Sequence, residues 1–121
     1  MTRELLLRLI AAIITVESGG DPAAVGDSGL AVGVMQIHPC YVADVNRIVG
    51  REQFALDDRT SPAASVTMFL IYIGHYCTPA RIGRAVTAED IARIHKSGPN
   101  GYKKPCSIKY WKKVEKTMAF P

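Results

Sequence analysis

An apolar run at helical spacing that ends at two glycines constrains this chain more than any other feature. It places apolar side chains every three or four positions: Leu6, Leu9, Ile10, Ile13 and Val16. That spacing predicts the buried face of a helix over residues 3–17. Gly19 and Gly20 follow, and glycine after a periodic run is a helix-stop signal, because it adopts left-handed backbone angles without steric cost. Glu17 is therefore expected in the last turn of a core helix.

Glu17 is an unusual residue for that position. The helix C-terminus carries partial negative charge and apolar neighbours withdraw the side chain from water, so both effects disfavour the ionised form. A carboxyl group that keeps its proton near neutral pH is what a general acid requires. Asp27 follows within the turn-forming sequence Gly26-Asp27-Ser28-Gly29, where a wetter, more acidic side chain is expected. Two carboxyl groups in such different surroundings can divide the acid and base roles in glycoside cleavage.

The segment from residue 17 to residue 39 also carries a motif. It reads Glu17-Ser18-Gly19-Gly20-Asp21-Pro22, then Ala24-Val25 and Gly29, and then Gly33-Val34-Met35-Gln36-Ile37-x-Pro39. This pattern resembles the active-site segment of the soluble lytic transglycosylase and goose-type lysozyme superfamily. Its Gly-Asp-Ser-Gly turn is similar to that of invertebrate-type and phage muramidases. The resemblance implies a lysozyme-like α+β fold, cleavage of the glycan strands of peptidoglycan, and a catalytic glutamate at Glu17.

The remaining pattern predicts a mainly helical α+β protein with four or five helices and a small β-hairpin lobe. The glycine-punctuated residues 24–37 favour the hairpin or an irregular lobe. Further helices are expected over 39–49, 61–77, 88–96 and 108–118. The helix over 61–77 is apolar nearly all round, which predicts a central buried helix. We expect a single domain over residues 1–121.

Four local signals support these boundaries. Pro39 suits the first helical position, and Gly50 suits the position after the last. Ser107 is a candidate cap for the final helix. Thr87 offers an N-cap with Asp90 at the third position, where we expect a weak capping box because aspartate is short. The residues between these helices, 51–60, are predicted to be a surface connection.

A second segment, 92–102, lies where transglycosylases carry a Tyr-Asn-Ala-Gly-like motif. By that resemblance His95 takes the aromatic position and Lys96 the asparagine position. Lysine only donates hydrogen bonds, whereas an asparagine amide also accepts them. Three interpretations of Lys96 stay open: a solvated loop residue, a partner for a carboxylate of the wall peptide, or a partner of Glu17 that would oppose acid catalysis.

Eight residues are expected to bind substrate: Ser28, Gln36, His38, Tyr76, His95, Lys96, Gly98 and Tyr102. Gln36 is expected to face the glycan, and Tyr76 and Tyr102 to stack on sugar faces. Each has a purely structural alternative, and for His38 and His75 an ordinary core or surface role is the more common one. Asp27 is either a catalytic partner or a turn aspartate that bonds its own backbone.

Composition limits the partners and cofactors. A net charge of +4 with a pI near 9.1 favours an anionic polymer as partner. Cys40, Cys77 and Cys106 form no zinc-binding spacing, so we expect no metal, no cofactor and free thiols, with one disulfide as the alternative. The N-terminal apolar run is interrupted by Glu4 and Arg8, which argues against a signal peptide and against a membrane span.

These observations predict a monomeric muramidase that acts on the bacterial cell wall, outside the cell, in the periplasm or delivered by a phage. Glu17 would protonate the glycosidic oxygen between N-acetylmuramic acid and N-acetylglucosamine, and Asp27 would position a water. Two alternatives keep the fold: a lytic transglycosylase that forms 1,6-anhydro products, and a catalytically silent wall-binding domain, suggested by Lys96 and Ser97. A nucleic-acid binder is not expected, because the lysine-rich last twenty residues carry no recognised nucleic-acid motif.

Overall fold

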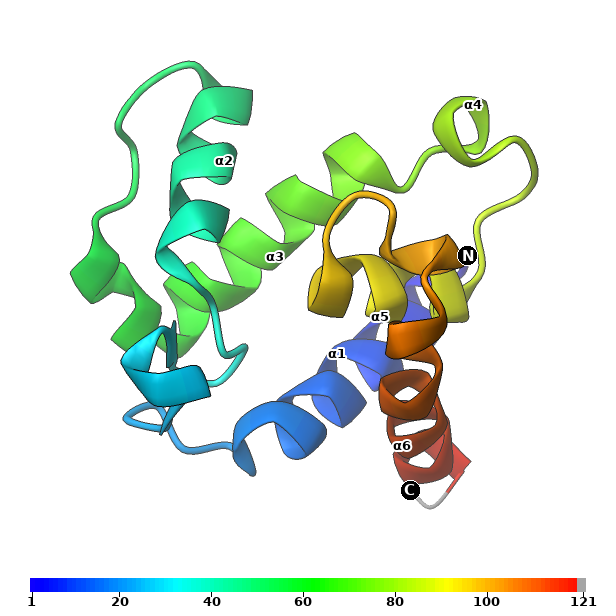
Figure 1. The fold of residues 1–121 in the computed structure, drawn as a ribbon, viewed down its shortest axis with the longest axis horizontal. Helices are drawn as coiled ribbons and strands as arrows, with labels where there is room; N and C mark the ends of the chain where they lie inside the picture. Colours follow the sequence, from blue (N-terminus) through cyan, green and yellow to red (C-terminus); the bar gives the residue numbers. More distant parts are fainter. Residues whose placement is uncertain (120–121) are drawn as a thin grey trace. The chain divides into compact units, whose positions relative to one another are not determined.

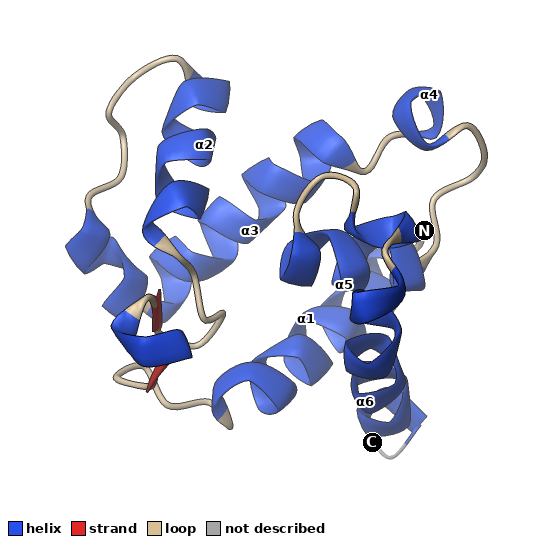
Figure 2. Cartoon of the chain, viewed as in Figure 1, coloured by secondary structure: helices blue, strands red, loops and turns tan. Residues whose placement is uncertain are grey.

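The computed structural model describes residues 1–119, which fold into six α-helices, short 3₁₀ turns and one two-stranded hairpin (Figures 1 and 2). The helices are α1 (Arg3–Ser18), α2 (Pro39–Val49), α3 (Pro62–Tyr76), α4 (Pro79–Ile82), α5 (Ala88–Ser97) and α6 (Ile108–Ala119). Strands β1 (Val25–Gly26) and β2 (Ala31–Val32) pair antiparallel, with Val25 opposite Val32. The predicted mainly helical α+β class is confirmed.

The described residues form two compact units. The central unit is Glu17–Tyr72, and the terminal unit combines Met1–Val16 with the chain from Ile73 onward. The central unit contains the hairpin and α2, and the terminal unit contains α4, α5 and α6. A single domain over residues 1–121 stays a prediction.

The first helix forms as its apolar spacing predicts. Leu9, Ile10 and Ile13 on α1 are buried, and Gly19 directly after the helix has a φ of +64°. In α6 the buried residues are Tyr110 and Val114, four positions apart on one face. For α1 the buried residues lie on the face that the apolar spacing predicted, while Leu6 and Val16 on that face are half-buried.

The start of α5 corrects one prediction. Thr87 Oγ1 accepts a hydrogen bond from the Asp90 amide at 3.2 Å, and Asp90 Oδ2 accepts one from the Thr87 amide at 2.9 Å. The capping box is complete, so the expected weakness was wrong. The short carboxylate reaches the backbone and also binds Arg84, whose two terminal nitrogens lie 2.7 and 2.8 Å from its oxygens.

A buried arginine connects α5 to the turns before α6. Arg93 Nε donates to Ser107 Oγ at 2.7 Å, and its Nη2 donates to the Lys104 carbonyl at 3.0 Å. Gly101 packs against the same segment, because a Cβ there would lie 2.0 Å from the Arg93 carbonyl oxygen. Ser107 Oγ also donates to the Gly101 carbonyl at 2.7 Å, so Ser107 helps to fix the 98–102 segment, beyond its predicted place before α6.

Helix α3 differs from the prediction of burial on every side. Met68, Phe69 and Tyr72 are buried, but Leu70 is 41% exposed because it lies on the opposite face of the helix. The Tyr72 ring stacks on that of Tyr41 in α2, with centroids 3.9 Å apart.

The chain after α3 contains a helix that the sequence did not predict. Thr78-Pro79 ends α3 as expected, but the same residues begin the four-residue α4, where Thr78 Oγ1 accepts from the Arg81 amide at 3.2 Å. Residues 51–60, predicted to be a surface connection, likewise end in a 3₁₀ turn over Leu56–Thr60.

Candidate active site

Glu17 occupies the position that the sequence predicted. It is the penultimate residue of α1 and is partly buried. The next residue, Ser18, donates its hydroxyl hydrogen to the Val34 carbonyl at 2.9 Å and accepts from the Gly20 amide at 3.1 Å. Ser18 therefore ties the end of the helix to the second half of the motif. This bond explains why a small hydroxyl residue follows the glutamate.

Asp27 lies at the tip of the hairpin and pairs with His38. Asp27 Oδ2 is 2.8 Å from His38 Nε2, with 57% of the Asp27 side chain and 36% of the His38 side chain exposed. An ionised carboxylate only accepts hydrogen bonds, so the ring nitrogen is the donor. Asp27 and Ser28 both adopt left-handed backbone angles, with φ of +49° and +57°. Such angles are uncommon for residues with a Cβ and concentrate at functional sites.

The backbone around Gln36 brings His38 to the hairpin. Gln36 turns the chain with a φ of +50°, and Ile37 then pairs with Val32 as a short antiparallel bridge. The Gln36 side chain donates from Nε2 to the carbonyls of Ala24 and Gly33, both at 3.0 Å. Both amide hydrogens of Gln36 are thereby committed to the lobe, so a glycan contact would have to use its Oε1. The predicted role of Gln36 in glycan binding stays a prediction.

Arg59 braces the same lobe, and sequence reasoning missed it. Its Nη1 donates to the Leu30 carbonyl at 3.0 Å and to the Ile37 carbonyl at 3.1 Å. Its own carbonyl accepts from Ser65 Oγ at 3.0 Å and lies so close to Gly33 that a Cβ there would be 1.9 Å away. The arginine holds the chain just after the hairpin tip and just before His38. No local pattern signals such a contact.

In the terminal unit, Tyr76 and Tyr102 flank the guanidinium of Arg81. The guanidinium carbon lies 5.4 Å from the Tyr76 ring centroid and 5.9 Å from that of Tyr102. Arg81 also donates to the Pro99 carbonyl at 2.5 Å and to Asn100 Oδ1 at 3.0 Å. The structure thus brings together the two tyrosines predicted to contact sugar, around an arginine that the sequence did not single out.

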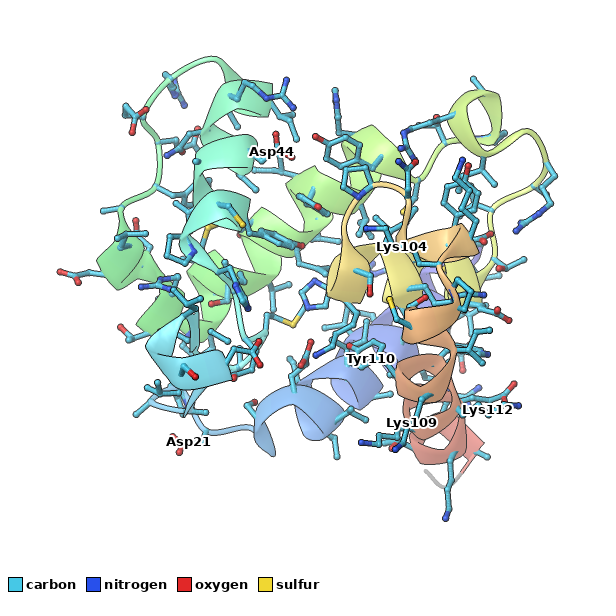
Figure 3. The ribbon with its side chains drawn as sticks, in the orientation of Figure 1. Asp21, Asp44, Lys104, Lys109, Tyr110 and Lys112 are labelled. Carbon is cyan, nitrogen blue, oxygen red and sulfur yellow. The ribbon has the colours of Figure 1, made fainter. Side chains whose placement is uncertain are left out.

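The other predicted residues of this unit lie at the end of α5. His95 is 6% exposed, which leaves little ring surface for a sugar. Lys96 is exposed, and its Nζ lies 5.5 Å from the ring centroid of Tyr110, a cation–π contact. Gly98 ends the helix with a φ of +89°. Figure 3 shows the side chains, with Tyr110 labelled beside α6.

The predicted site residues divide between the two units. Glu17, Asp27, Ser28, Gln36 and His38 belong to the central unit. Tyr76, His95, Lys96, Gly98 and Tyr102 belong to the terminal unit. Within the central unit the structure joins Asp27 to His38, and their roles with substrate stay predictions.

Residues 1–119 also bear on the expectations about metals, membranes, thiols and lysines. No group of three or more His, Cys, Asp or Glu side chains there is arranged to hold a metal ion, and no helix there is long and apolar enough to cross a bilayer. Cys40, Cys77 and Cys106 are free thiols, as expected. The lysines of the C-terminal segment are exposed: Lys103, Lys104, Lys109, Lys112, Lys113 and Lys116. Those on α6 lie away from its buried residues, which is typical of a solvated helix face.

A mainly helical chain in which a small hairpin lobe follows a helix with a glutamate in its last turn defines a lysozyme-like α+β protein. The comparison with solved structures agrees. A chain of the "Crystal structure of Aeromonas hydrophila PliI in complex with Meretrix lusoria lysozyme" superposes with a TM-score of 0.75 at 27% identity, covering 90% of this chain and 87% of that chain. The transglycosylase SLT domain matches residues 1–88, and the chain belongs to that family.

Two groups of curated relatives are similar in sequence. The "Endo-type membrane-bound lytic murein transglycosylase A" of two Klebsiella pneumoniae strains is 41% identical over 68 residues, or 54% of this chain and 33% of the relative. The "Lysozyme" of Ostrea edulis is 29% identical over 87 residues, or 71% of this chain and 59% of the relative. The chain thus spans a third of the length of those transglycosylases. The superfamily inferred from the motif is confirmed.

Proposed function

We propose that this chain is a peptidoglycan-cleaving muramidase that acts as a monomer on the bacterial cell wall, outside the cell, in the periplasm or delivered by a phage. The observation that carries the proposal is the SLT domain match over the segment in which Glu17 lies in the last turn of α1 and Ser18 is bonded to the second half of the motif. The names of the relatives, a murein transglycosylase and a lysozyme, support the same substrate class.

In the proposed reaction Glu17 is the general acid. Its proton passes to the glycosidic oxygen between N-acetylmuramic acid and N-acetylglucosamine, and the bond from that oxygen to the anomeric carbon breaks. A water attacks the same carbon while Asp27 accepts a proton from the water. Glu17 ends ionised and Asp27 ends protonated, so protons and charge balance. The 57% exposure of the Asp27 side chain is compatible with a base that must meet water.

A lytic transglycosylase is the second candidate, favoured by the 41% identity to the Klebsiella enzymes. In that reaction the C6 hydroxyl of the muramic acid attacks its own anomeric carbon and loses its proton to Glu17, which gives a 1,6-anhydro product without water. Hydrolysis is the preferred proposal because the Gly26-Asp27-Ser28-Gly29 turn places a second carboxylate at the hairpin tip.

Purified peptidoglycan tests both the site and the reaction. Glu17→Gln should lower the cleavage rate by at least about a hundredfold, with little change in thermal unfolding. Glu4→Gln is the matched control, because Glu4 is an exposed glutamate in the first turn of the same helix. Retained activity in Glu17→Gln would refute the acid assignment, and wall binding without cleavage by the unaltered protein would indicate a silent binding domain. Mass spectrometry of the products distinguishes reducing ends from 1,6-anhydro ends.

A further inference from the structure

We propose that His38 is a positioning residue that decides which nucleophile the enzyme uses. By donating its Nε2 hydrogen to Asp27 Oδ2, His38 holds the carboxylate in the orientation that favours water over the C6 hydroxyl of the substrate. This inference rests on the proposed hydrolysis and assigns a role to a histidine that the sequence treated as a substrate contact or an ordinary surface residue.

The backbone of His38 is fixed from several directions. Its carbonyl accepts from the amides of Tyr41 and Val42 at 3.0 and 3.3 Å, in the first turn of α2. Ile37, just before it, exchanges two backbone hydrogen bonds with Val32 at 3.1 and 3.2 Å. The ring therefore extends from an anchored position, and an anchored donor loses less conformational entropy when it forms a hydrogen bond.

The carboxylate belongs to a short turn at the tip of the hairpin. Asp27 begins the three-residue 3₁₀ turn Asp27–Gly29 at the hairpin tip, and more than half of its side chain is exposed. The 2.8 Å bond from His38 restrains one carboxylate oxygen and thereby the direction of the other. A base that must take a proton from water needs that direction fixed.

The Arg59 brace couples the two partners. Arg59 bonds the Leu30 carbonyl, which follows the hairpin tip, and the Ile37 carbonyl, which precedes His38. The segment after the acceptor and the segment before the donor are thus bonded to the same guanidinium, which favours their contact. A chance surface contact would not need such a support.

The identity of the products directly measures whether His38 influences the choice of nucleophile. After Glu17 gives its proton, the anomeric carbon can be captured by water or by the C6 hydroxyl, and the ratio of hydrated to 1,6-anhydro ends reports that competition. The ratio does not depend on how much of the protein is folded. A role of His38 that is only structural would lower the rate and leave the ratio unchanged.

The experiment compares product ratios by mass spectrometry for the unaltered protein and four variants. His38→Phe keeps a planar aromatic ring and removes the donor, so the hydrated-to-anhydro ratio should fall about tenfold, the value of one hydrogen bond to a charged group. His38→Gln retains an amide donor and should restore most of the ratio. Asp27→Asn should lower the ratio at least as far as His38→Phe. His75→Phe, at an exposed histidine in the terminal unit, should match the unaltered protein.

The outcomes separate the two proposals. If Asp27→Asn lowers the ratio and His38→Phe does not, the role of His38 is refuted and hydrolysis through Asp27 stands. If Asp27→Asn leaves the ratio unchanged, or the unaltered protein gives mainly anhydro ends, the proposed hydrolysis fails and the role of His38 fails with it.

Discussion

Gly33 allows a quantitative test of how the hairpin lobe is held together. Its φ is +86°, and a Cβ added there would lie 1.9 Å from the Arg59 carbonyl oxygen, far inside the 3.0 Å below which such contacts are essentially never found. Gly50, after α2, has nearly the same φ of +88° and nothing within 4 Å of its added Cβ. Both glycines adopt a left-handed φ, but only at Gly33 would an added Cβ collide with another residue.

The magnitudes follow from that comparison. Placing a residue with a Cβ in the left-handed region costs roughly 1–2 kcal/mol, which is the whole expected loss for Gly50→Ala. Gly33→Ala pays the same amount and must also displace the Arg59 backbone, which adds roughly 1–3 kcal/mol. Displacing Arg59 also disturbs its bonds to Leu30 and Ile37, so cleavage activity should fall in Gly33→Ala and persist in Gly50→Ala.

Urea denaturation followed by circular dichroism measures both free energies of unfolding, and a peptidoglycan turbidity assay measures both activities. The expected result is that Gly33→Ala is less stable than Gly50→Ala by at least about 1 kcal/mol. Equal losses of stability in the two variants would show that Gly33 does not meet the Arg59 carbonyl. Full activity in a destabilised Gly33→Ala would refute the claim that Arg59 positions the lobe.

Two further predictions concern the terminal unit. Burial raises the pKa of Asp90, but hydrogen bonds from Arg84 and Thr87 outweigh it and leave that pKa below its ordinary value. This contribution to stability is therefore complete above the unfolded pKa of about 3.9 and is lost as the pH falls through the lower folded value. Asp90→Asn should destabilise the protein at pH 7 by about 1.5–3 kcal/mol, and a urea titration that shows the same loss at pH 2 would contradict the sign. Burial, with a contribution from Asp90, raises the pKa of Cys77 to about 12. Iodoacetamide at pH 8 should therefore label the exposed Cys40 and Cys106 and spare Cys77 until the protein unfolds. Peptide mapping would show which cysteines are labelled.

The helices could be predicted because their signals are local. Gly19 and Gly50 end α1 and α2 with positive φ, and Pro39 begins α2, all as the sequence indicated. The placement of Glu17 followed from the same signals. The burial of α3 was overestimated, because composition reports how apolar a helix is and does not report which face meets a neighbour.

The contacts that build the candidate site could not be predicted in this way. His38 meets Asp27 through a turn at Gln36 that has an unusual φ for a residue with a side chain. Arg59 reaches Leu30 across 29 positions of sequence, and no spacing rule links the two. The capping box at Asp90 is stronger than predicted for another reason: the backbone at the start of α5 brings the short carboxylate within reach of the Thr87 amide.

Because the hairpin lobe depends on Arg59 and Ser65, the motif of residues 17–39 cannot be transferred to another protein by itself. A synthetic peptide of residues 17–39 would contain Glu17, Asp27 and His38, yet it would lack the guanidinium that holds Leu30 and Ile37. Such a peptide would lose the turn geometry in solution. Grafting the motif into another scaffold would require the 56–65 segment as a second, separately encoded piece, so the smallest transferable version of this motif is discontinuous in sequence.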